Sequence, residues 1–69
     1  MTMLKVIEVL AESPDSFDDA AQAAVANAAE TVRNIKSIYI KEMTGLVEEG
    51  VIVRYRVNAK LSFVVDGAD

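Results

Sequence analysis

One stretch of the sequence alternates between apolar and polar residues almost without exception, and it constrains the fold more than any other feature. From residue 51 to residue 63 every odd position is apolar or aromatic, and the even positions after Ile52 are polar: Arg54, Arg56, Asn58, Lys60 and Ser62. Successive side chains of a β-strand point to opposite faces, so the pattern predicts a strand with one apolar and one polar face. The apolar face requires a cover, whereas the polar face must meet water or another polar surface.

Two further strands and a turn surround this segment. Residues 37–48 form a second candidate strand, and Glu49-Gly50 separates it from the third, 51–65, so these two strands are expected to form a hairpin. A first strand of about eight residues, from Met3 to Leu10, is indicated by its β-branched content.

A helix is predicted between the first and second strands. Ser13 precedes Pro14 and Asp15, which suits a hydroxyl N-cap followed by proline in the first helical position and acidic residues in the first turn. Small apolar residues then recur at three- and four-residue spacing, and the helix is expected to end near Asn34. The order β-α-β-β predicts an α+β fold in a single domain spanning residues 1–69.

A single helix covers only one face of a sheet, yet the first strand places apolar side chains on both faces: Leu4, Val6 and Leu10 on one, Ile7 and Val9 on the other. The 69-residue chain contains neither cysteine nor histidine, so it lacks disulfides and the commonest structural zinc ligands. A core this small rarely supplies more than about 3–5 kcal/mol unaided. Self-association is therefore the expected source of additional stability.

Composition also limits the partners. Seven basic and eleven acidic residues give a net charge of −4, which repels nucleic acid and anionic membranes. No apolar run approaches the roughly 20 residues of a membrane span, and the first ten residues contain Glu8 with no small-residue cleavage site after them. We expect a cytoplasmic protein that binds neither nucleic acid nor membrane.

Several strings, in this order and spacing, resemble the dodecins, which are small β-α-β-β proteins. The similar segments are Val6-Ile7-Glu8-Val9, Ser13-Pro14-Asp15-Ser16-Phe17, Ala28 to Ile35, Gly45 with Gly50, and Lys60-Leu61-Ser62-Phe63. The resemblance implies a three-stranded antiparallel sheet with the third strand central, wrapped around one helix. It also implies a hollow homododecamer that stores flavin (FMN, FAD or riboflavin) in the best-known members.

Two positions depart from the flavin-binding members. Ser37 stands where the resemblance places a tryptophan that stacks on the flavin ring, and Arg56 stands where it places a glutamine that hydrogen-bonds the ring edge. Serine has no ring, and arginine offers only donors. Tyr39 lies about 7 Å further along the strand than Ser37, so it is not equivalent to the tryptophan. We therefore expect binding of a small ligand by a mode other than standard flavin stacking, with a flavin site of altered composition as one alternative.

The remaining candidate residues are charged. Arg54, Arg56 and Lys60, joined by Lys41 if it faces the same way, form a basic stripe on the polar face. This stripe is either an anion site inside the shell or between subunits, or a set of intersubunit ion pairs with Glu42, Glu48 or Glu12.

Carboxylates raise a different alternative, a divalent-cation site. Symmetry copies of Glu8, Glu12, Glu42, Glu48 and Glu49 meeting at an axis offer oxygen ligands for calcium or magnesium, although solvated surface carboxylates are the simpler explanation. No metal ligand can be assigned from the sequence. Without cysteine or histidine, and with no base beside its serines, the chain is not expected to be an enzyme.

Overall fold

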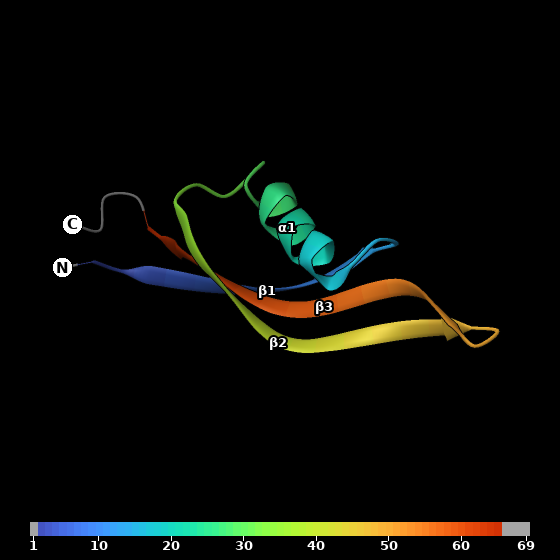
Figure 1. Cartoon of the computed structure of the whole chain (residues 1–69). Coiled ribbons are helices and arrows are strands. Elements are labelled where there is room, and N and C mark those ends of the chain that lie inside the picture. Colours follow the sequence, from blue (N-terminus) through green and yellow to red (C-terminus); the bar gives the residue numbers. More distant parts are fainter. Residues whose placement is uncertain (1, 66–69) are drawn as a thin grey trace.

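The computed structural model describes residues 2–65 and contains four elements. They are β1 (Leu4–Ser13), α1 (Phe17–Ala28), β2 (Ile35–Glu48) and β3 (Val51–Val64). The strands form one antiparallel sheet in the order β1-β3-β2, and α1 lies across one of its surfaces (Figure 1). The β-α-β-β order and the central position of the third strand are thereby confirmed.

The alternating pattern of β3 determines which sheet surface the helix covers. Val57, Ala59 and Leu61 are fully buried beneath α1, together with Ala20 and Ala24 of the helix. The ring of Tyr55 meets that of Phe17 edge to face, with centroids 5.0 Å apart. We call the covered surface the helix face and the opposite one the far face. The polar positions of β3, from Arg54 to Ser62, lie on the far face.

The helix begins later than the sequence predicts, so the assignment of Ser13 as N-cap is wrong. β1 continues to Ser13, which pairs with Tyr55 in the sheet and is only 2% exposed. Its hydroxyl donates to Asp19 Oδ2 at 2.7 Å and accepts from the Asp15 amide at 2.9 Å. The N-cap is Ser16, whose hydroxyl accepts from the Asp19 amide at 2.9 Å. Two serines three residues apart both suit a cap, and sheet pairing decides between them.

The helix also ends earlier than predicted, at Ala28 rather than near Asn34. Asn34 adopts a left-handed backbone (φ 62°), which asparagine tolerates better than most residues, and its carbonyl accepts a hydrogen bond from the Val64 amide at 3.1 Å. This link joins the connection to the sheet, and β2 begins at Ile35, two residues before the predicted start. β3 ends one residue before the predicted boundary. Residues 1 and 66–69 lie outside the described part of the chain.

β2 is an edge strand with an irregular register. Its pairing with β3 shifts at three places, between Ile35 and Ser37, between Ile40 and Glu42, and between Leu46 and Val47. The first two shifts each leave one residue of β2 without a partner, Lys36 and Lys41 respectively. Such bulges bend a strand and increase its twist, which fits the curvature of β2 beneath α1 in Figure 1.

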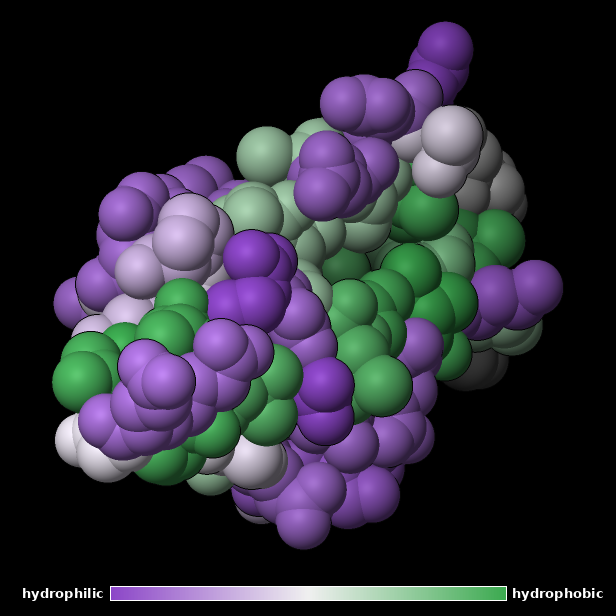
Figure 2. Space-filling view, turned by 90° about the vertical axis from the view of Figure 1, so that its right-hand side faces the viewer, coloured by the Kyte–Doolittle hydropathy of each residue, from purple (hydrophilic) through white to green (hydrophobic). Residues whose placement is uncertain are grey.

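The molecule is long and its core is small. Its radius of gyration is 14.1 Å, whereas a compact domain of this length has about 11 Å. The β2–β3 hairpin extends past the end of β1 (Figure 1), and hydrophobic surface lies open beside hydrophilic groups when the molecule is viewed from that end (Figure 2). Several large apolar side chains are about half exposed or more: Met3, Leu4, Val6, Leu10, Tyr39, Met43, Val47, Val51 and Ile52. The chain alone therefore leaves much of its apolar surface in water.

The backbone conformation of the hairpin turn can be tested by substitution. Glu49 (φ 51°) and Gly50 (φ 79°) both have positive φ, which is the conformation of a two-residue type I′ turn. Gly50→Ala should lower stability by about 1–2 kcal/mol, and because no heavy atom lies within 4 Å of the added Cβ, the cost arises from the backbone alone. Glu49→Asn should instead raise it by about 0.5 kcal/mol. Thermal unfolding of both variants measures the difference, and equal melting temperatures would contradict this assignment of the turn.

Candidate functional site

The far face carries most of the residues that the sequence singled out. The register places Glu8 opposite Lys60 and Glu12 opposite Arg56 on the β1 side. On the β2 side Ser37 lies opposite Ser62, Tyr39 opposite Lys60, and Thr44 opposite Arg56. Directly opposed residues of antiparallel strands share a face, so these side chains all lie on the polar side of β3.

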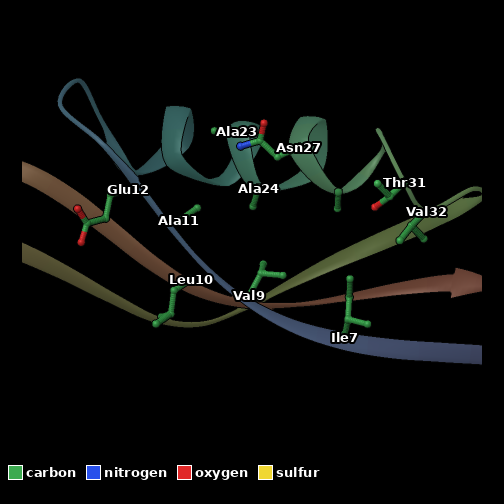
Figure 3. A pocket seen from close by; sticks show the side chains of 11 residues that line it. Ile7, Val9, Leu10, Ala11, Glu12, Ala23, Ala24, Asn27, Thr31 and Val32 are labelled. Atoms are coloured by element: carbon green, nitrogen blue, oxygen red, sulfur yellow. The ribbon is translucent and has the colours of Figure 1, made fainter.

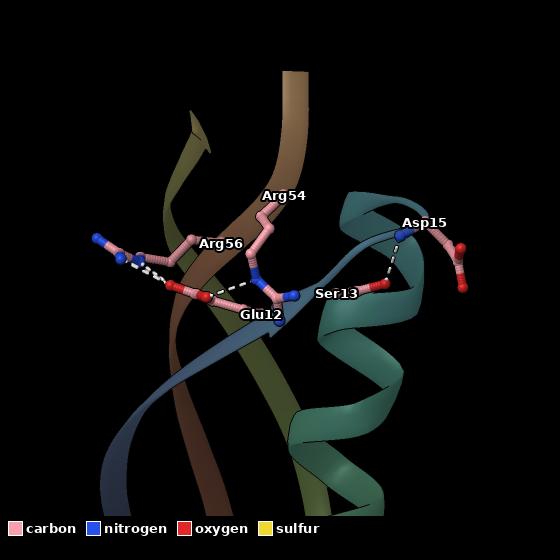
Figure 4. A network of polar contacts seen from close by, with 5 residues as sticks. All are labelled: Glu12, Ser13, Asp15, Arg54 and Arg56. Atoms are coloured by element: carbon pink, nitrogen blue, oxygen red, sulfur yellow. Dashed lines mark hydrogen bonds and ion pairs between the residues drawn. The ribbon is translucent and has the colours of Figure 1, made fainter. Parts of the chain in front are cut away.

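Glu12, Arg54 and Arg56 form one charged cluster at the end of β1 (Figure 4). Arg54 Nε donates to Glu12 Oε1 at 2.9 Å, and Arg56 Nε donates to Oε2 at 2.7 Å, with Arg56 Nη2 at 2.6 Å from the same oxygen. Arg56 thus approaches one carboxylate oxygen through two nitrogens while Arg54 occupies the other. One carboxylate between two guanidinium groups leaves a net charge of +1 and several N–H donors unused by Glu12.

The cluster changes the protonation of Glu12. Its hydrogen bond from Arg56, and then that from Arg54, hold the pKa of the Glu12 carboxyl below its ordinary value of 4.5, against a smaller opposing effect of burial. The side chains remain open to solvent, with Glu12 30%, Arg54 46% and Arg56 41% exposed. Water and salt therefore screen this interaction.

The other basic residues of the predicted stripe behave differently. Lys41, in a bulge of β2, reaches Glu8 of β1 with Nζ 3.5 Å from Oε2, so it does face the far side. Within residues 2–65 Lys60 makes no ion pair, and Tyr39 beside it is 64% exposed. Of the predicted ion-pair acceptors, Glu12 is used, but the pairing occurs within one chain. Glu8 was not among the acceptors proposed from the sequence.

The two positions of the family's flavin site do not come together within one chain. The hydroxyls of Ser37 and Ser62 hydrogen-bond each other across β2 and β3. Arg56 lies six residues from Ser62 along β3, which corresponds to about 20 Å. Within one chain, Ser37 and Arg56 therefore lie at well-separated points of the far face.

Sequence reasoning did not identify two features that the structure shows. A largely apolar groove of about 470 Å³ runs between α1 and β1, where Ile7 and Val9 point toward the helix and Leu10 points away from it (Figure 3). In addition, the side-chain oxygen of Asn58, on the far face of the central strand, is buried without a hydrogen-bond partner. Neither feature has a local sequence signal, because both depend on residues brought together by the fold.

Comparison with known proteins establishes the family. The family model described as Dodecin matches residues 3–66. The chain belongs to the dodecin family. It is 32% identical over 63 residues to calcium dodecin of Mycobacterium tuberculosis, covering 91% of this chain and 89% of that protein.

Solved dodecin structures have the same fold. A T. thermophilus dodecin variant superposes with a TM-score of 0.91 at 27% identity, over 96% of this chain and 98% of that one. Dodecin from Streptomyces coelicolor gives 0.89 at 31% identity, over 94% and 93%. Calcium dodecin from M. tuberculosis, a calcium-chelating antigen with a novel calcium-binding site, gives 0.80 at 28% identity, over 97% and 96%.

We also examined this dodecin for metal-binding groups and membrane-spanning helices. In the described part of the chain, no group of three or more aspartate and glutamate residues is arranged to hold a metal ion. Nor does any helix there have the length and apolar character needed to cross a membrane.

The Glu12 cluster predicts a specific dependence of stability on pH. A depressed folded pKa means that the carboxylate stabilises the fold above about pH 4.5 and that this contribution is lost as the pH falls through the folded pKa. Glu12→Gln should therefore lower the melting temperature by a few degrees at pH 7, with the difference from the unmodified protein vanishing in strong acid. Thermal unfolding at a series of pH values from 7 down into strong acid measures it; a difference that keeps the same size over the whole series would mean that charge on Glu12 is not the cause.

Proposed function

We propose that the chain is the subunit of a hollow homododecamer that binds and sequesters a small ligand. The main evidence for assembly is that more large apolar side chains are exposed than buried. Two of the five buried apolar residues, Val57 and Leu61, exceed alanine in size, while nine large apolar side chains are about half exposed or more. Exposed apolar surface of this extent marks association with other chains, and membership of the dodecin family supports twelve identical copies.

Far-face residues from several copies would supply the ligand site: Ser37, Tyr39, Lys41, Arg54, Arg56 and Lys60. Three of them, Lys41, Arg54 and Arg56, already contact carboxylates within the chain, so each copy presents a mixed-charge surface rather than a purely basic one. Ser37 supplies a hydroxyl in place of an aromatic ring. Polar contact therefore replaces ring stacking as the main mode of binding, and flavin bound at an altered site is the alternative.

A divalent cation is the second candidate ligand, and a specific relative favours it. The matched M. tuberculosis protein is named calcium dodecin, and its structure is described as having a calcium-binding site. Glu8 and Glu12 each have a basic partner in the same chain, and the described residues of one copy form no three-carboxylate group. A calcium or magnesium site would thus combine carboxylates from neighbouring copies.

We also propose that this single-domain protein, residues 1–69, works in the cytoplasm without catalysing a reaction. The hydroxyls of Ser13 and Ser16 take part in hydrogen bonds at the start of α1, and those of Ser37 and Ser62 bond each other. With no histidine or cysteine in the sequence, these serines have no strong base to activate them.

The assembly has a direct test. Light scattering at micromolar concentration should give a mass of about 90 kDa, twelve times the 7.5 kDa of one chain. Leu10→Lys, which places a charge at a side chain 68% exposed on the far face, should reduce that mass. Gln22→Lys makes the same change of charge at an exposed polar residue of α1 and should leave it unchanged. A monomer or dimer mass for the unmodified protein would overturn the dodecamer.

Flavin titration tests the ligand mode. The unmodified protein should quench flavin fluorescence weakly, because a stacked ring is worth about 1–3 kcal/mol in comparable aromatic contacts and Ser37 supplies none. Ser37→Trp combined with Arg56→Gln should restore strong quenching, provided that the assembled mass is retained. Tight quenching by the unmodified protein would show that Ser37 is no obstacle to flavin.

A parallel titration with calcium chloride distinguishes binding of a divalent cation from binding of an organic ligand. A rise in melting temperature that EDTA reverses, with no quenching of flavin, would favour the cation over both organic-ligand modes.

A further inference from the structure

A second cleft lies far from the arginine cluster, where the α1–β2 connection passes the ends of β1 and β3 (left side of Figure 1). Its volume is about 300 Å³, and it is lined by Lys5, Thr31, Arg33, Phe63, Val64 and Val65. Phe63 is nine residues from Arg54 along β3, or about 30 Å, and it belongs to the helix face. The cleft therefore shares no residue with the far-face site.

Backbone hydrogen bonds fix the walls of this cleft. At the connection, the amides of Thr31 and Val32 both donate to the Ala28 carbonyl, at 3.1 and 2.8 Å. At the sheet, the Val64 amide donates to the Asn34 carbonyl and the Val65 amide donates to Met3, at 3.1 and 3.0 Å. Thr31 and Arg33 are thus carried by a segment that is attached at both ends.

The strands place the remaining residues opposite this segment. Lys5 and Ile35 both pair with Phe63, one from each side of the central strand, so the Lys5 side chain lies next to the Phe63 ring position on the same surface. Lys5 of β1 and Arg33 of the α1–β2 connection therefore border the same cleft, and Phe63 of the central strand lies beside Lys5.

The cations of this cleft differ from those of the far face in their ion pairing. Lys41, Arg54 and Arg56 each lie within 4.0 Å of a carboxylate oxygen. Neither Lys5 nor Arg33 has such a partner among residues 2–65. In a chain of net charge −4, two cations that line one cleft and have no carboxylate partner among residues 2–65 provide a local site for an anion.

We propose that this cleft binds the phosphate group of a phosphorylated small molecule whose apolar part contacts Phe63. A guanidinium fork fits phosphate oxygens in pairs, and the lysine ammonium and threonine hydroxyl add further donors. A phosphate monoester carries a charge of about −1.5 to −2 near neutral pH, which matches two cations better than a single carboxylate does. The Phe63 ring and the cleft volume suit a small ligand body. This site goes beyond the proposed far-face function and does not depend on it.

Calorimetric titration of the assembled full-length protein with three probes tests the proposal. Phenyl phosphate should bind, inorganic phosphate should bind at least tenfold more weakly, and phenol should give no binding at the same concentrations. Arg33→Gln and Lys5→Gln should each weaken phenyl phosphate about tenfold or more. Arg33→Lys should recover only part of the loss, because lysine lacks the planar fork.

Matched controls separate this site from general electrostatic attraction. Lys36→Gln removes one positive charge from an exposed residue of β2 that does not line the cleft, and it should leave the affinity unchanged. Phe63→Leu should remove the preference for phenyl phosphate over inorganic phosphate while retaining phosphate binding. Circular dichroism and assembled mass verify that each variant is folded.

Three results would overturn the proposal. They are an absence of binding by the unmodified protein at millimolar phenyl phosphate, an equal loss in Lys36→Gln and Arg33→Gln, or full affinity in the folded Lys5→Gln and Arg33→Gln variants. None of these results bears on the far-face ligand or on the assembled mass, so failure here is distinguishable from failure of the proposed function.

Discussion

The burial of one face of β3 under a helix of small residues is the interaction on which the rest of the structure depends. Val57, Ala59 and Leu61 meet Ala20 and Ala24, and alanine allows the helix backbone to approach the sheet closely. The same contact is too small to hold the molecule alone, since a fully buried valine or leucine contributes only about 1.5–3 kcal/mol. A close but narrow helix–sheet contact thus gives the chain a definite shape while leaving many of its large apolar side chains exposed.

Charged residues are divided between two environments that differ in their pairing. On the far face, cations from β2 and β3 contact carboxylates from β1, so the pairing ties the first strand to the hairpin. At the opposite end of the sheet, Lys5 and Arg33 have no carboxylate partner among the described residues. The far-face pairs therefore serve the fold as well as any ligand, whereas the cleft cations make no ion pair between strands within residues 2–65.

Sequence periodicity was sufficient to predict the third strand and its apolar face, because the side-chain alternation of residues 51–63 is a local property of a strand. The central position of this strand in the sheet was implied by the resemblance to the dodecins. The helix boundaries were not predicted correctly, since Ser13 and Ser16 suit an N-cap equally and only pairing with Tyr55 draws Ser13 into β1. The position of Arg54 and Arg56 on the polar face was also predicted from the sequence. Their pairing with Glu12 inside one chain was not predicted, because Glu12 is 42 residues from Arg54 and 44 from Arg56 and the contact depends on the β1–β3 register. The phosphate cleft likewise combines residues from two strands and a connection.

The bulges of β2 have a consequence for what kind of assembly the chain can make. An edge strand with regular pairing exposes a row of amide and carbonyl groups on which further strands can add without limit, as in fibres. Here the outer edge is interrupted twice, and the inserted residue is a lysine in both places, Lys36 and Lys41. A bent edge bearing positive charge is a poor template for another strand. Growth by strand addition is thereby discouraged at this edge, so the closed particle that we propose would form through contacts between side chains.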